Sequence, residues 1–175
     1  MTQSYHKSAR QWALRALTRR MHTTHEIRTA LSRRRFEDDV VGSVMDELGR
    51  QGYIDDLHFT RVWVSSRSSH QLHGRLRLLR DLRQKGIPDD MAESVIRDLL
   101  PDEEEAAIAI KAAEKKLRSM RSIGKSIGKA AGRAAGRATG AKCREALYRH
   151  LRSRGFTAQA IRLAMAGLKF EEDPS

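Results

Sequence analysis

Several residue types are scarce in this 175-residue sequence, and each scarcity excludes a class of protein. A single cysteine, Cys143, excludes an internal disulfide and a multi-cysteine zinc site. Three prolines and 5% aromatic residues argue against a sandwich or barrel of short strands. The longest apolar run, Ala106–Ile110, is too short to cross a membrane, and no apolar signal segment precedes Trp12. We therefore expect a soluble, cytoplasmic, helical protein.

Positive charge is abundant and unevenly placed. The chain has 34 Lys and Arg against 22 Asp and Glu, a formal net charge of +12. Residues 115–154 hold 13 basic residues and one acid, Glu145, so this window alone equals the net charge of the chain. Such a segment is either solvated or in contact with a polyanion. Nucleic acid, or a surface that itself lies on nucleic acid, is the expected partner.

An internal repeat organises the chain. Three segments that begin at Leu31, Leu82 and Leu151 align without gaps. Each has apolar residues 5, 9, 10, 13, 14 and 17 positions after its first leucine, the last being Leu48, Leu99 and Leu168. Spacings of three and four predict the buried face of an amphipathic helix.

A sharp turn separates two helices in each repeat. Its glycine, Gly86 in the second copy and Gly155 in the third, suits a left-handed residue that ends a helix. Arg35 occupies this position in the first copy and is expected to strain or change the turn. Acids that begin the following helix fit capping electrostatics rather than catalysis. These acids are Asp38, Asp39, Asp89 and Asp90.

A further helix is predicted before each pair. The first spans about Ser8 to Arg20, and a capping box, Thr23 with Glu26, begins the next helix. The second runs from about Asp56, and the third begins after Pro101. The side chains expected to face inward are Ala13, Leu14, Leu17, Met21, Phe59, Val62, Trp63, Ile110, Ala113 and Leu117.

The predicted fold is all-α and elongated, with three tandem three-helix units that support one another. We call these units repeats one, two and three, at residues 1–54, 55–100 and 101–170, followed by a tail at 171–175.

Repeat three contains a basic, glycine-rich insertion at about 119–140. Leu31 and Leu82 lie 51 residues apart, whereas Leu82 and Leu151 lie 69 apart. Helix-interior glycines cost about 1 kcal/mol each relative to alanine, so a frayed or disordered linker is expected here, ordered only by an anionic partner. Glycine recurs every four residues from Gly124 to Gly140, and a cation follows the first four glycines. These cations are Lys125, Lys129, Arg133 and Arg137.

Motifs for catalysis or cofactor binding are incomplete. Gly124-Lys125-Ser126 resembles the end of a phosphate-binding loop, but Ser119 stands where the loop needs glycine. His25-Glu26 begins like a zinc-protease helix, but Thr29 replaces its second histidine. We expect no enzymatic activity, no metal and no cofactor, and a bystander role for Cys143.

Basic residues recur on the helix that precedes each turn. The helix that follows the turn is acidic in repeats one and two, which fits DNA poorly in a helix-turn-helix reading. The preceding helices suggest one continuous basic track. Their cations are Arg28, Arg33, Arg34 and Arg35, then Arg75, Arg77, Arg80, Arg83 and Lys85, then Arg144, Arg149, Arg152 and Arg154.

Residues across about 8–170 resemble the RecX family of recombination regulators. The specific segment is Gly52-Tyr53-Ile54-Asp55-Asp56 with Phe59, Arg67, Gly74, Arg77, Leu82, Lys85, Gly86 and Ile87. The opening Arg20, Thr23, Glu26 and Ile27 and the closing Leu151, Arg154, Gly155 and Phe156 also resemble the family. The insertion, Arg35 and Arg75 depart from its usual pattern.

The resemblance implies a protein that lodges in the groove of the RecA–DNA filament and mainly inhibits its recombinase, ATPase and co-protease activities. Homologous recombination, DNA repair and the SOS response are the implied setting. We expect a monomer whose partners are the RecA filament and non-specific single- or double-stranded DNA, with no membrane. The alternative is a helix-turn-helix DNA-binding regulator that acts without RecA.

Physical roles can be assigned to the matched residues. Tyr53 and Phe59 are expected to pack where repeats one and two meet, and either Asp55 or Asp56 to cap the next helix. Gly86 belongs to the same packing and capping motif. Charge reversal at exposed contact residues, Arg77 and Lys85 among them, should leave the fold intact. The candidate contacts with RecA or DNA are Arg67, Arg77, Lys85, Arg149, Arg152, Arg154, Lys125, Lys129, Arg133 and Arg137.

Overall fold

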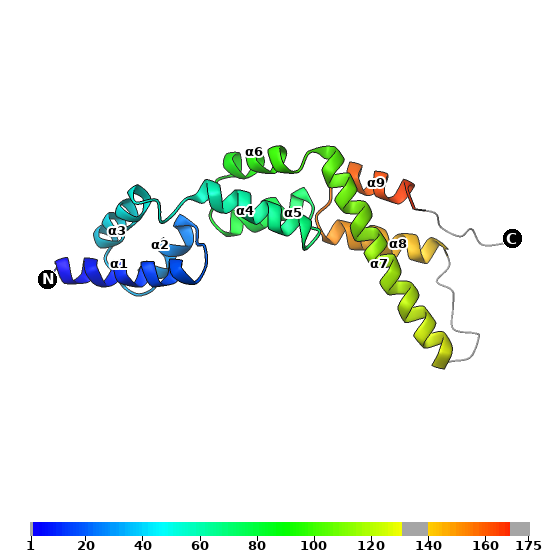
Figure 1. Ribbon diagram of the computed structural model, residues 1–175, viewed down its shortest axis with the longest axis horizontal. Helices are drawn as coiled ribbons and strands as arrows, with labels where there is room; N and C mark the ends of the chain where they lie inside the picture. The colour runs from blue at the N-terminus through cyan, green and yellow to red at the C-terminus, as the bar shows by residue number, and fades with distance from the viewer. Residues whose placement is uncertain (1, 131–139, 169–175) are drawn as a thin grey trace. The chain divides into compact units, whose positions relative to one another are not determined.

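The computed structural model describes residues 2–130 and 140–168, and within these ranges it contains nine helices and no strand. The helices follow one another in three groups of three, so the predicted all-α, three-repeat fold is confirmed (Figure 1). They are α1 (Thr2–Arg19), α2 (Thr24–Ser32), α3 (Asp38–Arg50), α4 (Asp56–Ser69), α5 (Arg75–Gln84), α6 (Asp89–Leu99), α7 (Asp102–Ala130), α8 (Gly140–Ser153) and α9 (Ala158–Ala166).

Contacts divide the described chain into two compact bodies. The N-terminal body comprises residues 2–64 and 79–95, and the C-terminal body comprises 65–78, 96–130 and 140–168. These bodies do not coincide with the three repeats, so the repeat boundaries stay a prediction.

The N-terminal body has a core in which α1 packs on α2 and α3 (Figure 1). Its fully buried side chains include Ala13, Ile27, Leu31 and Leu48, at the helical spacing that the sequence predicts. The predicted capping box of α2 is present in full. Removing these apolar surfaces from water is the main force that holds three short helices together.

In the C-terminal body, α7 packs on α8 and α9 (Figure 1). Small residues of α7, Ala109 and Ala113 among them, are buried beside the larger Leu147, Leu151 and Phe156. The acids in the first turn of α7 complement the positive end of its dipole.

All three repeats make the same turn between their second and third helices. In each copy a backbone N–H bonds back to the repeat's first leucine, namely Phe36 to Leu31, Ile87 to Leu82 and Phe156 to Leu151. Gly86 and Gly155 are left-handed as predicted, with φ of 74° and 75°. Arg35 adopts the same region at φ 62°, so the turn is kept, and a side chain there costs about 1–2 kcal/mol.

Several local expectations are wrong. Helix α1 begins at Thr2 rather than near Ser8. Three side chains expected to be buried, Met21, Val62 and Leu99, are 39%, 44% and 42% exposed. Val64 in α4 is buried in place of Val62, and Leu100, just after α6, is buried in place of Leu99. The helices are rotated so that a residue one or two positions further along faces the core.

The insertion is partly helical. Helix α7 continues to Ala130 through Gly124 and Gly128, so the expected frayed linker is wrong for residues 119–130. The alanine-rich start of α7, its packing and its acidic first turn favour the helix by more than these glycines cost. The rest of the insertion, 131–139, lies outside the described residues, and with it Arg133 and Arg137.

Candidate functional site

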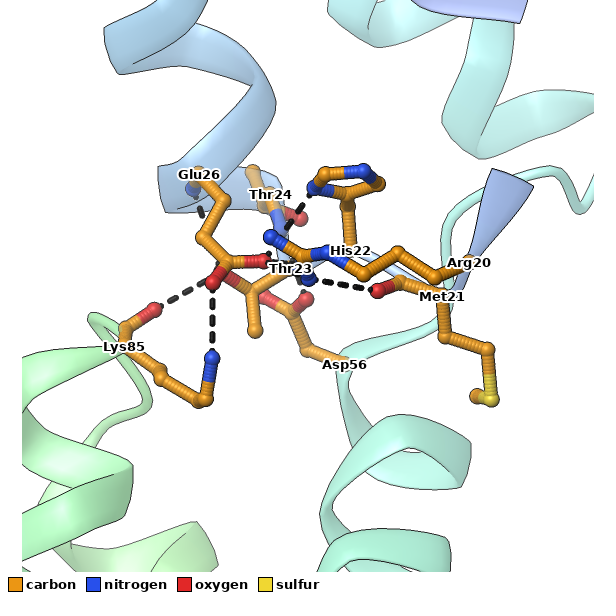
Figure 2. A network of polar contacts seen from close by, with 8 residues as sticks. All are labelled: Arg20, Met21, His22, Thr23, Thr24, Glu26, Asp56 and Lys85. Atoms are coloured by element: carbon orange, nitrogen blue, oxygen red, sulfur yellow. Dashed lines mark hydrogen bonds and ion pairs between the residues drawn. The ribbon is translucent and has the colours of Figure 1, made fainter. Parts of the chain in front are cut away.

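A polar junction joins repeat one to repeat two inside the N-terminal body. Thr23 caps α2, and its hydroxyl donates to the Lys85 carbonyl oxygen at 2.7 Å (Figure 2). The Thr24 N–H donates to Asp56 Oδ1, in the first turn of α4, at 2.8 Å. The start of α2 is therefore bonded both to the start of α4 and to the turn after α5. We call this the first junction.

A carboxylate at the centre of the first junction gathers three basic side chains. Glu26 lies 2.7 Å from Lys85 Nζ, 3.0 Å from Arg20 Nη1 and 3.3 Å from His22 Nδ1 (Figure 2). Burial raises the pKa of Glu26, but hydrogen bonds from Lys85 and Arg20 outweigh this and lower the pKa to about 2. Glu26 is therefore a stable anion that holds these cations in place.

Aromatic rings complete the surroundings of Lys85. Its ammonium lies 4.4 Å from the centroid of the Trp63 ring and 5.5 Å from that of Phe59. The two rings are stacked with centroids 5.6 Å apart. A lysine whose side chain is mostly buried against a carboxylate and two ring faces is fixed in position.

The same relation recurs between repeats two and three, inside the C-terminal body. Gly74 lies 51 residues after Thr23, and Arg154 lies 69 residues after Lys85, which are the spacings of the repeats. The Gly74 N–H donates to the Arg154 carbonyl, and the Leu76 N–H to that of Gly155, both at 2.9 Å. We call this the second junction. Backbone donors replace the Thr23 hydroxyl here.

A buried carboxylate, Glu105, serves the second junction as Asp56 serves the first. Glu105 accepts the Arg75 N–H at 2.9 Å, as Asp56 accepts that of Thr24. It also accepts the Thr157 hydroxyl at 2.7 Å and the Thr157 N–H at 3.2 Å. Three donors satisfy a carboxylate that solvent does not reach.

Glycine is required at the second junction by close packing. A Cβ built on Gly74 would lie 2.5 Å from the Gly155 carbonyl oxygen and from the Cα of Phe156. Backbone atoms cannot move aside as a flexible side chain can, so residue 74 has room only for hydrogen.

Arg154 closes the second junction from the side. Its guanidinium donates to the carbonyls of Gln71 and Leu72 and, at 2.9 Å, to His150 Nε2. Burial and the nearby Arg77 charge lower the pKa of Arg154. Burial, with the charges of Arg154 and Lys116, lowers the pKa of His150, which suits a neutral ring that accepts a hydrogen bond.

Comparisons with known proteins give the same two repeats. Residues 9–48 match the family model for the first three-helix domain of RecX, and residues 55–96 match that for the second. Regulatory protein RecX of Prosthecochloris aestuarii is 33% identical over 93% of this chain and 94% of its own length. The chain belongs to the RecX family. RecX of Chlorobium phaeobacteroides is 32% identical over 89% of this chain and 90% of its own length.

Solved RecX structures share the fold. The crystal structure of RecX from Lactobacillus salivarius has a TM-score of 0.73 at 18% identity, over 93% of this chain and 96% of that one. A second crystal structure, of regulatory protein RecX, has a TM-score of 0.76 at 20% identity, over 93% of this chain and 73% of that one. The first junction is built from both matched RecX domains.

Two of the candidate contacts with RecA or DNA form part of the junctions. Lys85 and Arg154 are held by the bonds described above, so charge reversal at Lys85 is now expected to destabilise the fold, unlike at an exposed residue. Arg75 donates to the Leu100 carbonyl at 2.7 Å and pairs with Asp102.

The other candidate contacts are more accessible. Arg77, Arg149 and Arg152 are exposed; Arg77 donates to the Ser153 carbonyl at 3.4 Å, and Arg149 lies 3.6 Å from Glu145. Arg67 is half-buried and donates to Gln71. Lys125 and Lys129 lie on the last turns of α7, where no side-chain position is described.

The structure agrees with some of the packing and capping roles expected from the sequence and not with others. Phe59 is buried as expected, but Tyr53 is 52% exposed and does not pack as expected. Asp55 is the residue that caps α4, because it accepts the His58 N–H at 2.8 Å. Gly86 lies in the left-handed turn, against the His25 side chain.

Sequence reasoning missed two residues that the structure singles out. Glu105 is one of them, and it lies four residues before Ala109 on the buried face of α7. Tyr148 is 45% exposed on α8 between basic residues.

Within residues 2–130 and 140–168, no three His, Cys, Asp or Glu side chains are grouped as a metal site would need. None of the helices described combines the length and the apolar character of a membrane span. Cys143 is a half-buried free thiol on α8.

Proposed function

We propose that this protein binds the RecA–DNA filament and regulates it, mainly by inhibiting its recombinase, ATPase and co-protease activities. The observation that carries the proposal is similarity to regulatory RecX proteins along nearly their whole length. The protein acts as a cytoplasmic monomer and performs no chemistry of its own.

The two junctions support this proposal. Each one fixes the start of a repeat's second helix to two elements of the next repeat through directed hydrogen bonds. A pre-arranged binding surface loses less conformational entropy on binding than a flexible one. The exposed cations of α8, with Arg77 at the start of α5, then meet the phosphates and carboxylates of a nucleoprotein filament, and such complementarity speeds association and selects partners.

The direct test is the DNA-dependent ATPase of RecA, measured with strand exchange while the protein is titrated at low molar ratio. We expect both activities to fall. The Arg77→Glu variant should inhibit less, whereas Arg97→Glu, a reversal at an exposed arginine of α6, should inhibit like the wild type. Unchanged ATPase and strand exchange on an assembled filament would exclude the proposal.

The alternative, a helix-turn-helix regulator that acts without RecA, has less support. Helix α6 would be the recognition helix of repeat two, yet four acids lie exposed along it, and they repel DNA. They are Asp89, Asp90, Glu93 and Asp98. Sequence-specific retention of a promoter duplex by the protein alone would favour this alternative.

A further inference from the structure

Helix α8 presents an exposed tyrosine within a row of arginines. Arg144, Tyr148 and Arg152 follow one another at intervals of four residues, so they lie on one side of the helix. Tyr148 is 45% exposed, and the side chain of its neighbour Arg149 is 71% exposed. Leu147 and Leu151, which are fully buried, lie on the adjacent face of the helix and make its core contacts. Nearly half of the Tyr148 surface stays outside this core.

Repeat three also lacks an acid that pairs with the corresponding arginine in repeat two. Arg83 donates to Asp89 across the turn at 2.6 Å, and this hydrogen bond to the carboxylate raises the pKa of Arg83. The corresponding residues of repeat three are Arg152 and Ala158, and the first turn of α9 contains no acid. The arginine is kept and its anionic partner is not. An external anion can take that place.

A further cation lies at the end of this row. Arg77, at the start of α5, donates to the Ser153 carbonyl at the end of α8. The row therefore continues from Arg144 through Tyr148 and Arg152 to Arg77, all within the C-terminal body. Glu145, which pairs with Arg149, is the acid on this helix.

We infer that this face of α8 binds single-stranded nucleic acid, with Arg149, Arg152 and Arg77 on the phosphates and the Tyr148 ring stacked on a base. Cations that follow the backbone and a ring that takes a base are how proteins bind single strands without reading sequence. A duplex offers phosphates, but its bases are already stacked. An acidic peptide would need the arginines and not the ring.

This inference deepens the proposed function, since it names a nucleic-acid contact for a filament regulator, but its test needs no RecA. The probe is a fluorescein-labelled oligothymidylate, followed by fluorescence anisotropy with the full-length protein. Because Tyr148→Ala removes the ring on which a base stacks, it should raise the Kd about tenfold. Tyr148→Phe keeps the ring and should bind like the wild type. Tyr53→Ala, which removes an equally exposed tyrosine from the N-terminal body, should change nothing.

A strand of the same length with abasic sugars separates stacking from charge. The wild type should bind it as weakly as Tyr148→Ala binds oligothymidylate, and Tyr148→Ala should bind both strands alike. On oligothymidylate, Arg152→Ala should lower the slope of log Kd against log salt by about 0.7, the value for one phosphate contact on a single strand.

Three results would overturn the inference. One is a Tyr148→Ala variant that folds, by circular dichroism, and binds oligothymidylate like the wild type. Another is an equal loss on the abasic strand, which would make the face a simple charged surface. The third is stronger binding to polyglutamate than to oligothymidylate. If the wild-type protein still inhibits RecA in any of these cases, the proposed function stands without this site. If the site binds oligothymidylate as described but the protein does not inhibit RecA, the site stands without the proposed function.

Discussion

The two junctions make the same connection with different residues. At the first, a threonine hydroxyl and an acid–base pair, Glu26 with Lys85, bond one repeat to the next. At the second, backbone N–H groups replace the hydroxyl, and Arg77 stands in the position of Glu26. The comparison shows that position in the repeat determines which segments meet, while the residues decide how they are held.

The charges at the two junctions also differ. Glu26 neutralises the cations around it at the first junction. Near the second, Arg77 and Arg154 lie close enough for one to lower the pKa of the other. Like charges repel, and a bound anion relieves that repulsion. The first junction therefore stabilises the protein, and the surface beside the second can attract a polyanion.

The largest expected effect is at Glu105. Glu105→Ala removes the acceptor for three part-buried donors, and each donor left without a partner costs about 1–3 kcal/mol. Glu104→Ala removes an exposed acid from the same helical turn and should change stability by less than about 0.5 kcal/mol. Urea unfolding followed by circular dichroism measures both. Equal midpoints would contradict the role of Glu105.

Close packing at Gly74 gives the next largest effect. Gly74→Ala forces a methyl group against backbone atoms and should cost about 1–3 kcal/mol. Gly49→Ala is the matched control, because nothing lies near its added methyl, and alanine there should stabilise α3 by up to about 1 kcal/mol. Thermal unfolding should therefore shift in opposite directions. A shift in the same direction would show that the junction tolerates a side chain at residue 74.

A smaller effect is expected from the pair at the first junction. In a double-mutant cycle of Glu26→Gln and Lys85→Met, the coupling free energy should be about 1–2 kcal/mol, because both side chains are about four-fifths buried. The exposed pair Arg83–Asp89 is the control and should give a much smaller coupling, because solvent screens it. Equal couplings would mean that burial adds nothing to the first junction.

The smallest effect is a pH dependence at the second junction. The pKa of His150 is lowered in the folded protein, so the unfolded chain binds more protons there as pH falls through its ordinary value of 6.5. Its contribution is complete above that pH and is lost below it. His150→Gln should flatten the fall in stability between about pH 7 and 5.5. The Glu26 pair should persist in this range, because the pKa of Glu26 is about 2. An unchanged pH profile would contradict this role for His150.

Sequence patterns predicted much of this fold for physical reasons. Repeated apolar spacing, turn glycines and a capping box are local features, and local geometry depends on neighbouring residues. The junctions depend on residues far apart in the chain, such as Glu105 with Arg75 and Thr157, and no local pattern pairs them. The wrong burial predictions for Val62 and Leu99 are of the same kind, because tertiary packing decides how far a helix is rotated about its axis.

The central claim is that the exposed cations of α8, with Arg77 beside them, bind the RecA filament, while exposed cations elsewhere, such as Arg83 and Arg97, do not. The most direct measurement is the RecA ATPase as a function of added protein, for Arg149→Ala/Arg152→Ala against Arg83→Ala/Arg97→Ala. Both double variants should unfold at the wild-type midpoint. The account predicts that the α8 variant needs about tenfold more protein for the same inhibition, since two contacts at about 0.7 kcal/mol each are lost, and that the control matches the wild type. Identical inhibition curves for the two variants would contradict it.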